Sequence, residues 1–156
     1  MNIEIKIADL SDLDKLHEIK LAAFRPLYEI YQDEASPYKH TKNHMATRMN
    51  RLDCDYYKIL CDSEICGGAA VYKVAVVYNW LAIIYISPFY QNKKIAQTAI
   101  SLLFDKYPFV KKWGLDFPID MLPNRKCYEK LGFTDTHKRE IINEKLTLAV
   151  YEKSFV

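Results

Sequence analysis

A short polar segment with two adjacent lysines, Gln91-Asn92-Lys93-Lys94, lies between an apolar run that ends at Ile86 and a helical pattern that begins at Ile95. The first turn of a helix has backbone N–H groups without intrahelical partners, and the two lysines add positive charge beside them. A phosphate or another anion is the ligand that such a helix start binds. This segment is therefore the first candidate for a binding site.

The absence of glycine from this segment narrows the choice of ligand. A P-loop requires Gly-x-x-x-x-Gly-Lys-Ser/Thr, and a dinucleotide-binding loop requires Gly-x-Gly-x-x-Gly directly after a strand. The stretch from 80 to 104 contains no glycine. Two ligands could use this helix start: a nucleotide phosphate or the pyrophosphate of coenzyme A. Both glycine-rich modes of nucleotide binding fit this segment poorly.

A second motif near the C-terminus combines a helical spacing with a helix stop. Asn124 and Tyr128 are four residues apart, so they share one face of a helix, and Gly132 is typical of the residue just past a helix end. A tyrosine with a pKa near about 10 carries a proton at neutral pH and can act as a general acid. Taken alone, the same pattern is also typical of a core tyrosine.

The stretch from Ile84 to Ala96 resembles the acetyl-CoA segment of the GCN5-related N-acetyltransferases. In that family a strand ending in an aliphatic-x-Pro signature leads into Gln/Arg-x-x-Gly-x-Gly/Ala and a helix. Gln91, Ile95 and Ala96 match this pattern, whereas Lys94 replaces the first glycine. We expect Lys94 to adopt helical φ and ψ at the helix start. The stretch 124–133 resembles the family's second signature, and the two motifs occur in the family's order.

The resemblance implies acetyl-CoA as the cofactor and assigns roles to particular residues. The backbone N–H of Ile86 would polarise the acetyl carbonyl where two strands separate, and Tyr128 would protonate the departing thiolate. The cofactor-binding residues that it implies are Ile84, Tyr85, Ile86, Gln91, Asn92, Lys93, Lys94, Ile95, Ala96, Asn124 and Tyr128.

The resemblance places the segment 24–51 over the acceptor. This segment combines aromatic rings with carboxylates, which suit a cationic amine. The substrate-binding candidates are Tyr28, Glu29, Tyr31 and Asp33. An alkyl ammonium must lose its proton before it can attack, and no residue is identified as the base; Glu29, Asp33 and Glu34 are the candidates.

The implied activity is transfer of the acetyl group of acetyl-CoA to a primary amine of a small molecule or peptide, by direct attack in a ternary complex. Two alternatives stay open: transfer of a longer acyl group, and a non-catalytic CoA-binding or regulatory module. An amine panel assayed for thioester consumption separates the enzymes from the binding module.

Composition points to one domain over residues 1–156. The chain is 50% hydrophobic and has a formal net charge of +2, so it has apolar residues for a sizeable core and no charge excess for binding a polyanion. We expect neither nucleic acid nor a membrane as a partner, because no apolar run reaches the roughly 18 residues that span a bilayer. We expect a cytoplasmic protein, and the sequence is compatible with a homodimer.

Cysteine and histidine patterns do not indicate a metal site. Four cysteines occur without a Cys-x-x-Cys pair, and we expect reduced thiols, with a Cys61–Cys66 disulfide as the minor alternative. His40 and His44 have the i, i+4 spacing of a helix, but no third ligand is evident, so we interpret both as surface residues of a helix.

The order of elements predicts an α+β fold with three layers, in which helices cover both faces of a mixed, mostly antiparallel sheet. Ser11, with Asp14 three residues later, should cap the first helix, and Pro26 and Pro37 should divide 24–51 into short helices. Gly67-Gly68 indicates a bulge or a close backbone approach. The expected strands are 3–7, 56–61, 65–77, 80–86, 113–117, 134–142 and 146–155, and the expected later helices begin at Ile95 and Asn124.

Overall fold

The computed structural model describes residues 1–155 and contains one seven-stranded sheet. Its strand order is β1-β2-β3-β4-β5-β7-β6, and every neighbouring pair is antiparallel except β4 and β5. The strands are β1 (Ile3–Ile7), β2 (Cys54–Cys61), β3 (Glu64–Ala75), β4 (Tyr78–Ile86), β5 (Lys112–Pro118), β6 (Thr134–Asn143) and β7 (Leu146–Ser154). The predicted mixed, mostly antiparallel sheet is confirmed.

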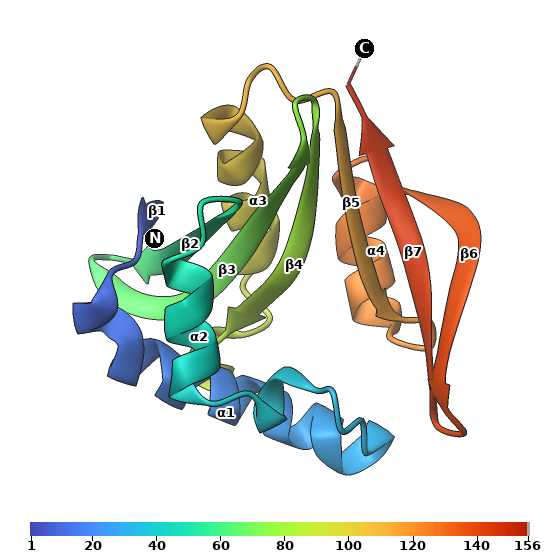
Figure 1. Cartoon of the computed structure of the whole chain (residues 1–156), viewed down its shortest axis with the longest axis horizontal. Helices are drawn as coiled ribbons and strands as arrows, with labels where there is room; N and C mark the ends of the chain where they lie inside the picture. Colours follow the sequence, from blue (N-terminus) through green and yellow to red (C-terminus); the bar gives the residue numbers. More distant parts are fainter. Residues whose placement is uncertain (156) are drawn as a thin grey trace.

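Helices cover both faces of this sheet, as Figure 1 shows. Helices α1 (Leu13–Tyr31) and α2 (Lys42–Met49) contact one face, and α3 (Ile95–Lys106) and α4 (Leu122–Lys130) lie on the other. Strand residues alternate between the two cores: Ala69 and Val71 pack with the α3 side, whereas Ala70 packs with the α1 side. The strands are therefore buried on both faces, which explains their almost continuous apolar runs.

The central strands β4 and β5 are paired over only three residues at one end. The pairs are Tyr78 with Lys112, Asn79 with Trp113 and Trp80 with Gly114. Beyond Trp80 the two strands diverge, and Figure 1 shows the opening between their lower halves. The α3 crossover joins the two strands, so the start of α3 lies at the wide end of this opening.

A close backbone approach explains the glycine pair in β3. A Cβ atom at Gly67 would overlap the carbonyl oxygen of Tyr85, and one at Gly68 would overlap the ring of Tyr85. The register between β2 and β3 shifts between Ile59 and Leu60, directly opposite this pair. Both predicted meanings of the pair, a bulge and a close approach, are therefore present at the same place.

Two predictions about α1 are wrong. Ser11 is not its cap: it lies inside a 3-10 helix, Leu10–Asp12, that leads directly into α1 and is capped by Asp9, which accepts from the Ser11 backbone N–H at 2.9 Å and forms a capping box with Asp12. The N-cap of α1 itself is Asp12, whose side chain makes no capping hydrogen bond. Pro26 does not interrupt the helix, which continues to Tyr31. The carbonyl that Pro26 leaves without its usual donor belongs to Ala22, and both residues are exposed, so water can replace the lost hydrogen bond.

The histidine and cysteine predictions have separate outcomes. His40 ends the short 3-10 helix Pro37–Lys39 and precedes α2, so only His44 is helical; their rings stack with centroids 3.9 Å apart.

All four cysteines, which lie within the described range, are free thiols. The cysteines Cys61 and Cys66 are therefore reduced, as the favoured prediction has it.

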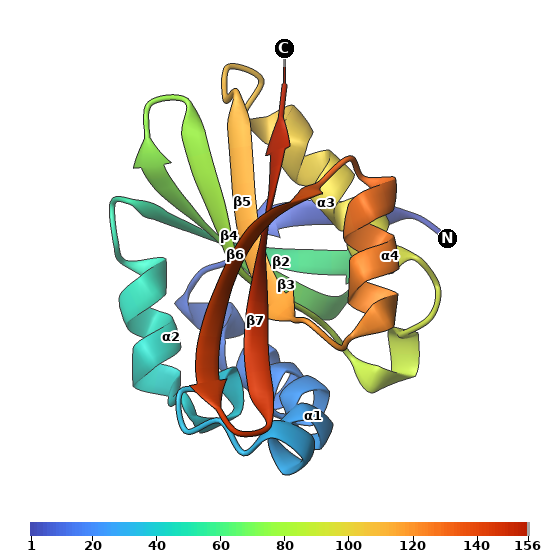
Figure 2. The ribbon, with the colours of Figure 1, turned by 90° about the vertical axis from the view of Figure 1, so that its right-hand side faces the viewer.

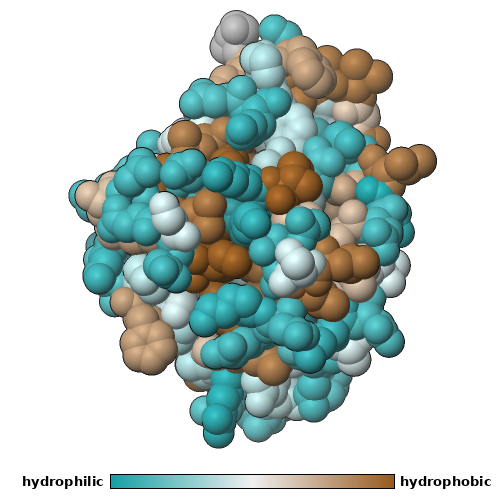
Figure 3. Space-filling model, turned by 90° about the vertical axis from the view of Figure 1, so that its left-hand side faces the viewer, coloured by the Kyte–Doolittle hydropathy of each residue, from teal (hydrophilic) through white to brown (hydrophobic). Residues whose placement is uncertain are grey.

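The β1 edge of the sheet carries charge. Glu4 and Lys6 lie on this strand, with their charged groups 4.0 Å apart. Figure 3 shows that this side of the molecule is largely hydrophilic, with apolar groups in separate patches. Charged residues on an edge strand disfavour pairing with a strand of another chain.

Among the helices of residues 1–155, none combines the length and the hydropathy that a membrane-spanning segment requires.

Candidate active site

Two hollows adjoin the opening between β4 and β5. The first, the α3 groove, has a volume of about 620 Å³ and is bordered by α1, the end of β4, the start of α3 and α4. The second, the central cavity, has a volume of about 360 Å³ and is bordered by α1, the segment after it, β4, β5 and the β6–β7 hairpin. Residues that line both are Phe24, Leu27, Ile84, Asn124 and Tyr128. The two hollows therefore meet at these side chains.

The end of β4 directs its free backbone groups into this opening. The N–H of Ser87 donates to the carbonyl of Cys66 in β3 at 2.7 Å. Because successive strand residues point their backbone groups to opposite sides, the N–H of Ile86 is directed away from β3. Strand β5 pairs with β4 only as far as Trp80. The Ile86 N–H consequently faces the opening, where it can donate to a bound carbonyl.

A glutamine side chain holds the connection after β4. The Nε2 of Gln91 donates to the carbonyl oxygen of Ile86 at 2.9 Å, and this oxygen lies on the same side of the strand as the Ile86 N–H. The hydrogen bond folds the segment that carries Gln91 back toward the strand end. It thereby positions the start of α3 at the rim of the α3 groove.

Lys94 does not have the helical conformation expected of it. Its φ of 61° and ψ of 22° lie in the left-handed region, immediately before the first residue of α3, and Asn92 also has a positive φ of 63°. A residue other than glycine pays roughly 1–2 kcal/mol in this region. The backbone at this position must be left-handed. This is the physical reason why the pattern Gln/Arg-x-x-Gly-x-Gly/Ala has a glycine where this chain has Lys94.

The start of α3 presents backbone donors to the α3 groove. The N–H groups of Ile95, Ala96 and Gln97 belong to the first turn, which has no intrahelical acceptors for them, and all three residues line the groove. Lys94 lines it as well, whereas Lys93 does not and instead lies over the ring of Tyr90, with 5.7 Å from its Nζ to the ring centroid. The groove thus offers a place for an anionic group.

Tyr128 occupies the junction of the two hollows. Its ring packs against Phe117 at 5.2 Å and Phe133 at 6.0 Å between centroids, and the residue is only 8% exposed. Burial raises the pKa of its hydroxyl well above the usual value, so the group is protonated at neutral pH. None of the described residues hydrogen-bonds to this hydroxyl, which leaves its proton available to a ligand.

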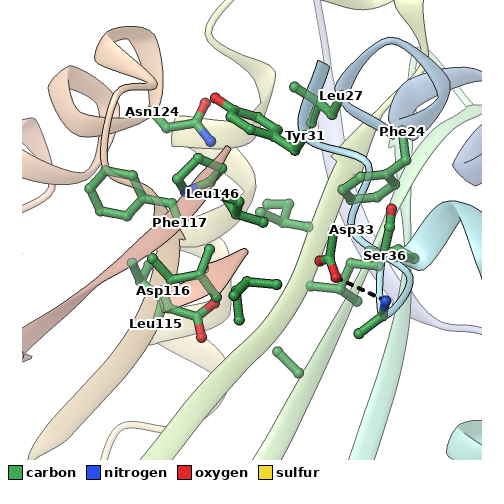
Figure 4. Close-up of a pocket in the computed structure, with 18 of the residues that line it drawn as sticks. Phe24, Leu27, Tyr31, Asp33, Ser36, Leu115, Asp116, Phe117, Asn124 and Leu146 are labelled. Atoms are coloured by element: carbon green, nitrogen blue, oxygen red, sulfur yellow. Dashed lines mark hydrogen bonds between the residues drawn. The ribbon is translucent and has the colours of Figure 1, made fainter. Parts of the chain in front are cut away.

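The central cavity has an acidic wall that the sequence analysis did not identify. Asp116 on β5 and Glu140 on β6 both line it. Burial raises the pKa of Asp116 to about 6, with a further contribution from the negative charge of Glu140. Figure 4 shows Asp116 on one wall of the cavity and Asp33 on the other. Asp116 follows Leu115 and precedes Phe117, two core residues, so strand alternation alone points it to the opposite face.

The chain matches the family model of the acetyltransferase (GNAT) family over residues 13–133. This match covers more than half of the 156 residues. The chain belongs to the acetyltransferase (GNAT) family. It is accordingly an acetyl-CoA-dependent N-acetyltransferase, and coenzyme A is its cofactor. No curated protein matches this acetyltransferase significantly in sequence.

Solved structures of other acetyltransferases have the same fold. The PaiA N-acetyltransferase of Thermoplasma acidophilum, in complex with coenzyme A, has a TM-score of 0.79 at 22% identity, covering 99% of this chain and 100% of that one. The spermidine N-acetyltransferase of Vibrio cholerae, in complex with coenzyme A and spermine, has a TM-score of 0.78 at 16% identity, covering 97% and 95%. The ribosomal-protein-S18-alanine N-acetyltransferase of Escherichia coli has a TM-score of 0.77 at 15% identity, covering 98% and 94%.

The structure of this acetyltransferase brings most of the predicted site residues together. Those of the cofactor set that line the α3 groove are Ile84, Tyr85, Ile86, Gln91, Asn92, Lys94, Ile95, Ala96, Asn124 and Tyr128. Of the acceptor set, Tyr28, Tyr31 and Asp33 line the central cavity. Glu29 is not among the lining residues; it is exposed and pairs with Arg25 at 3.2 Å, because it lies on the outer face of α1.

Proposed function

We propose that this acetyltransferase transfers the acetyl group of acetyl-CoA to a primary amine of a small molecule or peptide within a ternary complex. One observation carries the proposal: the α3 groove and the central cavity meet at Ile84, Asn124 and Tyr128, beside the backbone N–H of Ile86. A thioester entering from the groove and an amine entering from the cavity would meet there, and direct attack requires this kind of juxtaposition.

In the proposed cofactor site, backbone donors do most of the binding. The first-turn N–H groups of α3 and the charge of Lys94 would receive the pyrophosphate. The acetyl end would then extend along β4 to the opening, with its carbonyl oxygen accepting from the Ile86 N–H. This donor requires no particular side chain, since it depends only on where β4 and β5 separate.

Asp116 is the base that we propose for the acceptor. An alkyl ammonium has a pKa of roughly 10, so its proton must be removed before the nitrogen attacks the acetyl carbon. Asp116 lines the cavity and has a pKa of about 6, so it is ionised at neutral pH and can accept that proton. The wall formed with Glu140 also attracts the cationic form of the amine.

Tyr128 completes the proposed proton balance. The amine nitrogen forms a bond to the acetyl carbon, the carbon–sulfur bond breaks, and the thiolate takes a proton from the Tyr128 hydroxyl. The tyrosinate is then neutralised by proton exchange with solvent. The ammonium nitrogen gives one proton to Asp116 before the attack and a second proton to solvent as the amide forms, and Asp116 then releases its proton to solvent. The net products are therefore the acetylated amine, free CoA with its thiol, and one proton.

The experiment that tests this function measures thiol release from acetyl-CoA in the presence of primary amines. We expect amine-dependent turnover and an acetylated product by mass spectrometry. Asp33→Asn should raise the KM of the amine several-fold, because Asp33 lines the cavity, whereas Glu29→Gln should not change it. Saturable acetyl-CoA binding without turnover of any amine would contradict the proposed acceptor class.

A further inference from the structure

One corner of the central cavity holds positive charge without a carboxylate partner. Arg48 on α2 and His40 both line this cavity, and the ammonium of Lys20 on α1 lies directly behind them. Burial lowers the pKa of His40 to about 4, so its ring is neutral at pH 7. The charge of this corner therefore belongs to Arg48 and Lys20.

The guanidinium of Arg48 is held in place by packing. Its Cζ lies 5.7 Å from the centroid of the Tyr72 ring, and its Nε is buried without a hydrogen-bond partner. Within residues 1–155, Arg48 forms no ion pair with any carboxylate. A buried arginine nitrogen with an unused proton is unfavourable, because buried polar groups are ordinarily satisfied.

Lys20 adds a second cation that is more deeply buried. The residue is 2% exposed, and its Nζ donates to the backbone carbonyl of His40 at 2.9 Å. Burial lowers the pKa of Lys20 to about 8, with a further contribution from the positive charge of Arg48. Lys20 is still mostly protonated at pH 7, so two like charges lie close together in a poorly hydrated place. Such an arrangement is unfavourable until an anion joins it.

Three acidic side chains line the same cavity. One of them accepts a backbone hydrogen bond, and the other two come from strands on the far side of the cavity. Asp33 accepts from the backbone N–H of Ala35 at 2.9 Å, a contact drawn as a dashed line in Figure 4. Asp116 and Glu140 come from β5 and β6 on the sheet side. The cavity is thus acidic on its β5–β6 wall, whereas its α2 side carries the cations Arg48 and Lys20 beside Asp33. Such a distribution is complementary to a molecule with a cation at one end and an anion at the other.

We propose that the acceptor of this enzyme carries an anionic oxygen group in addition to its amine, and that Arg48, supported by Lys20, binds that group. This inference rests on the proposed function, since it takes the central cavity as the acceptor site. The planar guanidinium can donate two parallel hydrogen bonds to a carboxylate or a phosphonate. An amino acid with its amine and acid groups separated by a short carbon chain is the simplest acceptor of this kind.

The test compares amines that differ only in the anion. Beta-alanine, γ-aminobutyrate and ε-aminocaproate are each titrated beside their primary amides into the CoA-bound enzyme by calorimetry, with aminopropylphosphonate as the second source of the anion. We expect the best-fitting acid to bind about tenfold more tightly than its amide, as a charge-assisted pair would give. Tighter binding of the phosphonate than of the carboxylate would identify the phosphorus acid as the preferred anion.

Arg48→Gln should remove the preference for the acid while leaving the affinity for the amides and for CoA unchanged. Arg48→Lys should restore part of it, because the charge remains but the planar fork is lost. Arg51→Gln is the matched control: Arg51 lies 5.5 Å from the same Tyr72 ring but is paired with Asp53 at 2.8 Å and does not line the cavity. The control should keep the full preference.

The outcomes separate this inference from the proposed function. Equal affinity of each acid and its amide, or a preference that survives Arg48→Gln, overturns the anion site, even where plain alkylamines are acetylated. Arg48-dependent binding of an acid without acetylation of any amine would support the anion site and contradict the proposed acetyl transfer.

Discussion

The hydroxyl of Tyr31 donates a hydrogen bond of 2.7 Å to Oδ1 of Asp120, joining the last turn of α1 to the loop between β5 and α4. Asn143 in the β6–β7 hairpin reinforces this place by donating to the carbonyl of Tyr31 at 3.0 Å. Figure 2 shows the turn of this hairpin close to the end of α1. The two halves of the sheet, which separate at β5, are thus linked across the central cavity by α1.

Tyr31→Phe should loosen this link. A hydrogen bond to a charged group contributes roughly 1.5–3 kcal/mol, and Tyr31 is only 5% exposed, so urea unfolding should show a loss of that order. The KM of the amine should rise, since α1 lines the central cavity. Tyr38→Phe is the control, because the Tyr38 hydroxyl has no hydrogen-bond partner within the described chain. Equal stability of the two variants would show that the Tyr31–Asp120 bond contributes nothing.

Tyr128→Phe should slow the chemical step more than cofactor binding. Positioned acid catalysis contributes on the order of 10²–10⁴ in rate, so kcat should fall by about that factor while acetyl-CoA affinity changes little. Tyr151→Phe is a close match, because Tyr151 packs on the same Phe117 at 4.8 Å and lines neither hollow. If single-turnover rates of the two variants are the same, Tyr128 is a packing residue and not the acid.

Lys94 permits a test that separates backbone conformation from charge. Lys94→Ala keeps the unfavourable left-handed backbone, whereas Lys94→Gly relieves it, so the glycine variant should have a free energy of unfolding about 1 kcal/mol above that of the alanine variant. Both variants lose the same charge, and both should bind acetyl-CoA more weakly by calorimetry if Lys94 contacts the pyrophosphate. Weakening in the alanine variant alone would mean that conformation, not charge, is what binding requires.

The pKa of Asp116 predicts the acid limb of the pH–rate profile. A base with a pKa of about 6 becomes protonated below that pH, so kcat/KM should fall as pH drops through 6. Glu140→Gln removes the neighbouring negative charge, which should lower the pKa of Asp116 and move the limb to lower pH. Asp116→Asn should lower kcat/KM at pH 7 by on the order of 10²-fold or more and abolish the limb. A limb that stays near pH 6 in Asp116→Asn would assign the titration to another group.

The raised pKa of Asp116 also predicts how stability changes with pH. This change has the opposite sign to the one that a salt-bridged carboxylate causes. The folded-state pKa of about 6 lies above the ordinary 3.8, so between these values the folded protein binds more protons than the unfolded chain. Stability should therefore decrease as pH rises from about 4 to 6. Asp116→Asn should remove this contribution and have a higher Tm than the wild type at pH 7, but not at pH 4. An unchanged Tm difference across that range would mean that Asp116 is not shifted.

Much of the fold follows from local patterns in the sequence. The strand that ends before Pro88, the helix from Ile95 and the stop at Gly132 occur where they are predicted, because each depends on neighbouring residues within a few positions. The departures are also local. Asp9 caps a 3-10 helix that contains Ser11 and precedes α1, and Pro26 stays inside α1 because tertiary contacts of the helix outweigh one lost hydrogen bond.

The sequence by itself determined the family resemblance, the helix-start segment and the shared helical face of Asn124 and Tyr128, because these are properties of spacing. Only the tertiary structure decided which charges meet across the cavity. Asp116 and Glu140 come from strands that β7 separates in the sheet, and Arg48 and Lys20 come from different helices. Burial and the distance between two charges set a pKa or an ion pair, and neither quantity exists until the chain has folded.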